Sequence, residues 1–202
     1  MNSVMRIPLD TTPEQLARLV SLQDTFAVVC NALAPTVQKS RCWNRVALHH
    51  MVYKSLREQF PALGSQMVCN AIYSVSRTSR LVFQHPQSPF NLTKLGDKPL
   101  PLLHFGANCP VYFDRHTLSV KGGQLSLFTL DGRMRFQLAL GPQDEAAFKQ
   151  KKLREIVLAR AADHLFELSF TFFEEGDDAA AEQSVDEHQG EIPEYVMVEE
   201  ME

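Results

Sequence analysis

Apolar residues recur with helical spacing over most of the first 80 positions. A short strand is predicted over Val4–Leu9, and the segment Thr12-Pro13-Glu14-Gln15 then has the signature of a helix start, with a capping threonine and a proline in the first turn. Pro35 is expected to end this helix, because proline cannot donate the backbone hydrogen bond that a helix interior needs. Two further helices are predicted over Asn44–Phe60 and Ser65–Thr78.

After residue 80 the spacing changes from helical to alternating. Met134, Phe136 and Leu138 alternate with polar residues, as in a strand that buries one face. The glycines at Gly122-Gly123 and Asp131-Gly132 mark hairpin turns. The predicted β segments are Val111–Phe113, Thr117–Val120, Gln124–Leu130, Arg133–Leu140, Ile156–Arg160 and Leu165–Phe173, with a short helix over Pro142–Arg154. The pattern therefore predicts an α+β protein with a mainly antiparallel β part and helices inserted near its start.

The charges are segregated along the chain. From Glu174 to the end there are 12 Asp and Glu and no Lys or Arg, so residues 1–173 hold 12 of the 24 acidic residues and all 20 basic ones, a net charge of about +8. Such asymmetry indicates a polyanionic partner for the basic part, or an acidic tail that only aids solubility. No run of about 18 apolar residues and no secretory leader pattern is seen, so we expect a cytoplasmic protein without a membrane partner.

The sequence nominates no catalytic, metal or cofactor site. The cysteines Cys30, Cys42, Cys69 and Cys109 lack the close spacing of a zinc site, and reduced thiols are the expectation. The adjacent His49 and His50 would point apart on a helix. No phosphate-binding glycine loop or nucleophile motif is found, so we expect a protein that is not an enzyme and uses no cofactor.

Two groups of residues are candidates for nucleic-acid binding. The helix over Ser65–Thr78 has a polar, nearly uncharged stripe with Gln66, Asn70 and Arg77, which suits either hydrogen bonds to bases and sugars or contact with another helix. A basic cluster in the β part suits phosphate contacts. Its residues are Arg133, Arg135, Lys149, Lys151, Lys152 and Arg154. Lys121, in a neighbouring turn, is a further candidate.

Four collinear segments resemble one protein family. They are the run from His49 to Phe60 (HHMVYKSLREQF), the pair SQM and AI within residues 65–72, the run from Tyr112 to Lys121 (YFDRHTLSVK), and the run from Leu125 to Arg133 (LSLFTLDGR). In order and spacing they are similar to the N-terminal half of TnpB-type transposon nucleases and of type V CRISPR effectors. The resemblance covers about residues 4–173.

The resemblance implies a β-barrel wedge domain, here residues 1–10 and 81–173, with a helical recognition insertion, here residues 11–80. The acidic tail over 174–202 is expected to be disordered in isolation, because it has few apolar residues before Ile192. The resemblance further implies that Tyr53 and Lys54, with Arg57 on the same helix, and Gln66 and Asn70 on the next approach a target duplex. The family's RuvC-like nuclease segment has no counterpart in this sequence. We therefore expect a non-catalytic subunit that binds guide or structured RNA and target DNA, together with other protein subunits, in a CRISPR-like, antiviral or transposon-derived complex.

The acidic tail leaves other functions open. The segment from Ile192 to Val198 alternates apolar and polar residues, as does a peptide that adds a strand to a sheet or docks in a groove. Its candidate partner-binding residues are Ile192, Tyr195, Val196 and Val198. The alternatives are accordingly an interaction or inhibitor protein that acts through its tail, or one half of a split nuclease.

Overall fold

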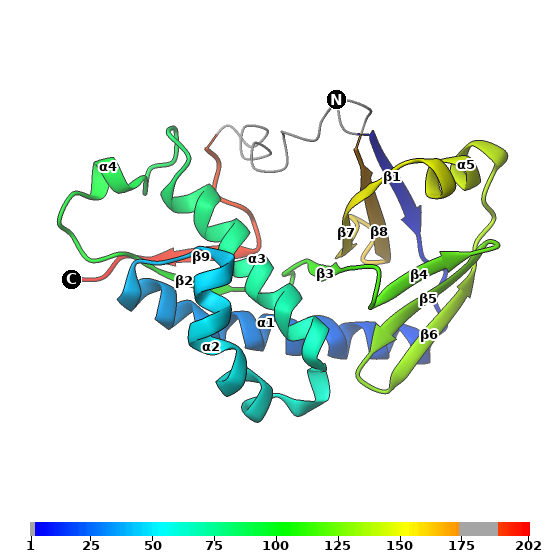
Figure 1. Ribbon diagram of the computed structural model, residues 1–202, viewed down its shortest axis with the longest axis horizontal. Coiled ribbons are helices and arrows are strands. Elements are labelled where there is room, and N and C mark those ends of the chain that lie inside the picture. The colour runs from blue at the N-terminus through cyan, green and yellow to red at the C-terminus, as the bar shows by residue number, and fades with distance from the viewer. Residues whose placement is uncertain (1–2, 174–189) are drawn as a thin grey trace. The chain divides into compact units, whose positions relative to one another are not determined.

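The computed structural model describes residues 3–173 and 190–202 and divides the chain into two compact units (Figure 1). Among the described residues, the sheet unit comprises residues 3–23 and 110–173, and the helical unit comprises residues 24–109 and 190–202. Helix α1 (Pro13–Ser40) contributes residues to both units. The described elements are α helices and antiparallel sheets, as the sequence pattern predicted.

The sheet unit contains a four-stranded antiparallel sheet with the strand order β1-β8-β7-β3. Its strands are β1 (Ser3–Pro8), β8 (Phe166–Phe172), β7 (Leu153–Arg160) and β3 (Val111–Phe113). Alternate residues of β8 are buried, and the ring of Phe148 on helix α5 (Pro142–Gln150) packs edge-on against Phe170 and Phe172, with centroid distances of 5.0 and 5.4 Å. The first strand of the chain is thus held at the sheet edge by β8, the last strand of this unit.

A second sheet in this unit has the order β4-β5-β6, formed by two successive hairpins. Its strands are β4 (Leu118–Lys121), β5 (Gln124–Thr129) and β6 (Gly132–Gln137). Gly122, Gly123 and Gly132 have φ values of 57°, 77° and 102°, which confirms the predicted glycine turns. Leu125, Leu127 and other alternate residues are buried, so the opposite face of the sheet carries the polar side chains.

The expected closed barrel is wrong for the described residues, whose strands form separate open sheets. The break falls between β3 and β4. There the carboxylate of Asp114 accepts hydrogen bonds from the backbone N–H groups of His116 and Thr117, at 3.1 and 3.0 Å. This Asx-type turn ends β3 after three residues and redirects the chain, so the hydrogen-bond ladder of one sheet does not continue into the other.

The helical unit contains α2 (Arg45–Gln59) and α3 (Ser65–Phe83), joined by the short helix η1 (Pro61–Leu63). The Asn44 side chain caps α2 by accepting from the N–H of Ala47 at 3.1 Å. Both predicted helices are confirmed, and α3 continues five residues further than expected because its last turn, Leu81–Phe83, is buried. Leu48, Val52 and Leu56 form the buried stripe of α2, whereas Met51 is 46% exposed.

Helix α1 does not end at Pro35 but continues to Ser40. Proline removes one backbone hydrogen bond, yet Leu33, Ala34 and Val37 around it are buried, and this packing outweighs the loss. Helix α1 is also long and apolar enough to cross a membrane: the mean hydropathy over 18 of its residues is 1.2, and 44% of that stretch is buried inside the protein. A core helix and a signal sequence meet the same criterion.

A two-stranded antiparallel sheet, β2 (Leu102–Phe105) with β9 (Val196–Glu199), belongs to the helical unit. Residues 81–109 therefore group with the helices, whereas the sequence assigned them to the β part. The reason lies in α1: the Asn31 side chain donates to the carbonyl of Phe105 at 2.9 Å and accepts from its N–H at 2.7 Å. Leu100, Leu103 and Phe105 are buried in this unit. The short helix α4 (Leu92–Leu95) lies between α3 and β2.

The C-terminal end of the acidic tail is ordered, which corrects the expectation of disorder for residues 190–202; the rest of that expectation concerns residues 174–189, outside the described part. Tyr195 anchors the segment. Its hydroxyl hydrogen-bonds with Thr78 at 2.9 Å, its carbonyl accepts from the N–H of Gly106 at 2.9 Å, and its ring stacks on Phe105. Gly190 lies so close to Gln87 that an added Cβ would come within 2.6 Å of its backbone. The alternating apolar residues of the tail therefore bury against its own chain.

The Tyr195 hydroxyl makes this docking sensitive to alkaline pH. Burial is the main cause that raises its pKa above the ordinary value of 10, although the hydrogen bond with Thr78 acts in the opposite direction. A raised pKa in the folded state means that the stabilisation is present below pH 10 and is lost as the pH rises toward the folded-state pKa. We expect Tyr195→Phe to cost about 1 kcal/mol at pH 8 and to reduce the loss of stability above pH 10. Denaturant unfolding of both proteins at pH 8 and 10.5 measures this; an unchanged alkaline loss in Tyr195→Phe would contradict it.

Candidate nucleic-acid interface

The outward face of the three-stranded sheet brings basic, amide and hydroxyl side chains together, and we call it the β4–β6 face. It consists of Ser119, Lys121, Gln124, Ser126, Phe128, Arg133, Arg135 and Gln137. The strand register places Arg135 opposite Ser126 and Arg133 opposite Phe128, and pairs Gln124 with both Lys121 and Gln137. The three strands contain no Asp or Glu. The face is therefore positively charged, with hydrogen-bonding groups between its cations.

Arg133 is held in place on this face. Its Nε donates to Ser126 Oγ at 2.7 Å, and its two terminal nitrogens donate to the carbonyls of Ser126 and His116 at 3.0 and 3.4 Å. All three acceptors are neutral, so these bonds orient the guanidinium and leave its charge uncompensated by them. Arg135 and Lys121 are exposed on the same face. Three of the predicted phosphate-binding residues thus lie together.

Two of the other predicted basic residues of this unit lie at Phe173. Lys152 and Arg154 both lie over its ring, with the charged groups 5.4 and 5.8 Å from the ring centre. Lys151 Nζ donates to Ser3 Oγ at 3.2 Å, and Lys149 lies in the last turn of α5. The ring attracts both cations through the negative charge of its faces. We call Phe173, Lys152 and Arg154, together with the lysines Lys149 and Lys151 that precede them in the sequence, the Phe173 cluster.

The helical candidates form a less open surface than the sequence predicted. Tyr53 stacks on His49, with ring centres 4.4 Å apart, and Lys54 is exposed. Asn70, however, is buried, and its amide donates to the sulfur of Met67 at 3.6 Å. The neighbouring Ser74 is also buried. The polar stripe of α3 therefore packs inward at these two positions. This burial agrees with the second interpretation of the stripe, a contact with another helix.

The remaining residues on these helices are partly accessible. Gln66, Arg57 and Arg77 are each partly buried, and one terminal nitrogen of Arg57 is enclosed by the protein. Gln66 and Arg77 remain candidates for polar contacts, whereas an interaction of the Asn70 amide with a duplex would require α3 to move.

The predicted partner-binding residues at the C-terminus contact the chain itself. Val196 pairs with Phe105 and Val198 with Leu103 in the β2–β9 ladder, while Tyr195 is held as described and Ile192 is partly buried. A side-chain pair between His104 and Glu199 lies at the other end of the ladder. The strand-adding character of this segment, which the sequence predicted, is satisfied within the molecule.

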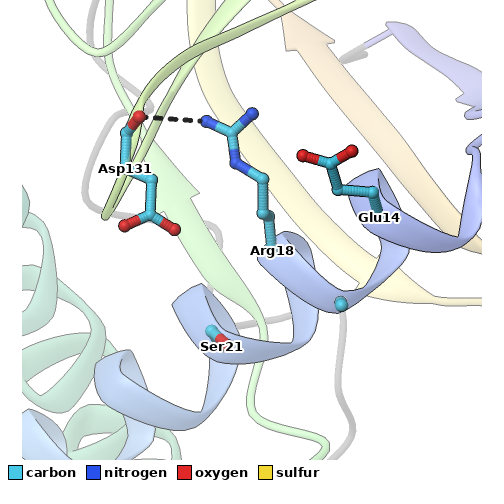
Figure 2. A pocket seen from close by; sticks show the side chains of 5 residues that line it. Glu14, Arg18, Ser21 and Asp131 are labelled. Carbon is cyan, nitrogen blue, oxygen red and sulfur yellow. Dashed lines mark hydrogen bonds between the residues drawn. The ribbon is translucent and has the colours of Figure 1, made fainter.

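A pocket with a volume of about 500 Å³ opens beside α1 in the sheet unit and was not predicted from the sequence (Figure 2). Glu14, Ala17, Arg18, Ser21 and Asp131 line it. One terminal nitrogen of Arg18 donates to Thr129 Oγ1 at 2.7 Å and to the Asp131 carbonyl at 3.3 Å. The arginine therefore ties the helix to the β5–β6 turn, which gives it a structural role.

Within residues 3–173 and 190–202, no three His, Cys, Asp or Glu side chains are grouped as metal ligands. None of the four cysteines forms a disulfide, and Cys30 and Cys109 are buried. Burial is the main cause that raises the pKa of the Cys30 thiol, and the neighbouring Cys109 raises it further. Such a thiol stays protonated, which makes it a poor nucleophile and metal ligand.

Comparison with models of known protein families finds no match for this chain, and a search of curated proteins finds no relative.

Proposed function

We propose that this protein is a non-catalytic nucleic-acid-binding subunit that binds guide or structured RNA, with or without a target duplex, in an RNA-guided complex. The observation that carries the proposal is the β4–β6 face, where Lys121, Arg133 and Arg135 lie on strands without an acidic residue. Arginine suits this role because its planar fork of donors matches phosphate oxygens. The resemblance to the N-terminal half of TnpB-type proteins supports the same function and suggests a CRISPR-like, antiviral or transposon-derived setting.

The Phe173 cluster extends the phosphate-binding surface that we propose. A polyanion that contacts several lysines and arginines releases its condensed counterions, so binding weakens steeply with salt. Lys152 and Arg154 share one ring, and an anion placed beside them would relieve their mutual repulsion. Contacts of this kind carry no sequence information, which agrees with a subunit that leaves target choice to base pairing.

Salt-dependent RNA binding tests the proposal. We expect Lys149→Ala/Lys151→Ala/Lys152→Ala to weaken binding of structured RNA equally across sequences and to lower the salt slope by up to about 2–3, because each lost phosphate contact removes roughly 0.7–0.9. Fluorescence anisotropy between 50 and 300 mM salt measures this, with Lys39→Ala/Lys94→Ala/Lys98→Ala in the helical unit as the matched control. A parallel arm with Mg²⁺ or Mn²⁺ should leave the RNA intact. Unchanged affinity and slope in the sheet-unit variant would show that the cluster is not used.

The charge distribution favours a second candidate function, in which the tail recruits a basic partner or inhibits by mimicking nucleic acid. Seven of the tail's acidic residues lie in residues 174–189, before the docked strand β9. As a mimic of nucleic acid, the tail could also compete with RNA for the basic surface of its own chain. At physiological salt, charges interact only over about 8 Å, so this competition requires the tail to lie on the basic surface itself.

Neutralising those seven residues to Gln or Asn while keeping 190–202 separates these functions. We expect RNA binding to tighten at low salt and to match the unaltered protein at high salt, because the tail competes electrostatically. Anisotropy titrations at 50 and 300 mM salt measure this. Unchanged RNA affinity with loss of a co-purifying protein would instead identify the tail as a recruiter, and co-purification of a separate RuvC-like chain would identify a split nuclease.

A further inference from the structure

The β4–β6 face carries one aromatic side chain among its basic and polar groups. Phe128 occupies an outward position of β5, where the alternate residues Leu125, Leu127 and Thr129 are buried, and it is itself partly exposed. Its cross-strand neighbour on β6 is Arg133. The described chain covers this ring only in part, so some of it remains accessible to an apolar partner.

We propose that the β4–β6 face is a stacking platform for single-stranded RNA, with Phe128 holding a base and Arg133 and Arg135 holding the adjoining phosphates. This inference rests on the proposed function and specifies its ligand. A base can lie flat on an aromatic ring only when it is not paired within a duplex, whose bases are stacked on one another. The ring therefore selects single strands, whereas the cations accept any nucleic acid.

The remaining side chains of the face fit the same ligand. From Phe128 to Gln124, β5 spans about 13 Å at roughly 3.3 Å per residue, which is room for two or three nucleotides. Gln124 and Gln137 lie opposite each other at the far end, and Ser126 lies between. Amides and hydroxyls can both donate and accept, as hydrogen bonds to base edges and to the ribose 2′-hydroxyl require. Charge complementarity and these groups together make RNA the occupant.

Hydrogen bonds fix the position of Arg133 on this face. Its three hydrogen bonds to Ser126 and His116 hold the guanidinium in a single place beside Phe128. A pre-oriented cation loses less conformational freedom on binding than a mobile one. The phosphate that precedes or follows the stacked base then meets a fixed donor.

The test uses the full chain and a single-stranded RNA that carries the fluorescent base 2-aminopurine, with the matching duplex RNA as the second ligand. We expect Phe128→Leu to weaken binding of the single strand by roughly 5- to 100-fold and to abolish the quenching of 2-aminopurine, while duplex binding stays unchanged. Phe128→Tyr should restore both signals. Arg135→Gln should weaken both ligands.

Two controls keep the result interpretable. Phe148→Leu alters a ring that packs against Phe170 and Phe172, so it reports the effect of losing an aromatic side chain away from the face. Thermal unfolding verifies that Phe128→Leu is folded. If it is not, quenching of 2-aminopurine by the unaltered protein serves as the test, and a bound single strand without quenching would overturn the platform. Equal losses on both ligands, or no loss on the single strand, would overturn the platform while leaving the proposed function in place. Absence of RNA binding in the unaltered protein would overturn both.

Discussion

Deleting residues 190–202 is expected to lower the free energy of unfolding of the helical unit by on the order of 3–6 kcal/mol, a large part of the 5–15 kcal/mol typical of a domain. The deletion removes the β2–β9 ladder, the hydrogen bond between Tyr195 and Thr78, and the packing of Val196. It also exposes Leu103 and Phe105, which are buried in the intact protein. Denaturant unfolding and dye binding to exposed apolar surface measure the effect.

Two substitutions in the same strand provide the control for that deletion. Val196 is buried and Met197, its neighbour, is 66% exposed. Val196→Ala should therefore cost about 1–3 kcal/mol and Met197→Ala close to nothing. If the deletion leaves the unfolding midpoint unchanged, the ordered end of the tail contributes nothing to stability.

Reversing the charge of Arg133 and Arg135 to glutamate is expected to reduce RNA affinity by at least about 100-fold at low salt. Each substitution removes a phosphate contact and places a like charge opposite the polyanion, and the salt slope should fall by about 1–2. Filter binding or anisotropy over a salt series measures both quantities.

The matched control is Arg6→Glu/Arg160→Glu, which changes the net charge of the same unit by the same amount. Arg6 lies on β1 beside Glu167, and Arg160 lies over the ring of Phe166, so neither belongs to the β4–β6 face. If the control loses as much affinity as Arg133→Glu/Arg135→Glu, only the overall charge matters and the face has no special role.

The sequence predicted elements that local rules control. The strands with clean alternation and the glycine turns of the β4–β6 sheet appear as predicted, because period and turn chemistry act over a few residues. The continuation of α1 through Pro35 was missed because tertiary burial overrode a local rule. Pairing of β2 with β9 was missed because no local pattern links segments more than 90 residues apart.

In the candidate site, too, the sequence predicted what local features determine and missed what depends on contacts between distant segments. Lys121, Arg133 and Arg135 were selected by charge, and the hairpin register brings them together. Phe128 was missed because it lies in a largely apolar segment. Side chains alternate between the two faces of a strand, so only the burial of Leu125 and Leu127 reveals that Phe128 faces outward. For Asn70 the sequence left a contact with bases and a contact with another helix both open, because the sequence alone does not show which side of α3 other elements cover; the structure buries this residue.

The position of β9 near the C-terminus has a consequence for biosynthesis. Its partner β2 leaves the ribosome about 90 residues earlier, so at roughly 5–20 residues per second the edge of β2 waits on the order of 5–20 s for its neighbour. Until then the nascent helical unit presents an unpaired strand with Leu103 and Phe105, a surface that chaperones bind and that invites aggregation. A chain whose translation stalls before residues 196–199 are made keeps that surface exposed, which marks it for quality-control proteases.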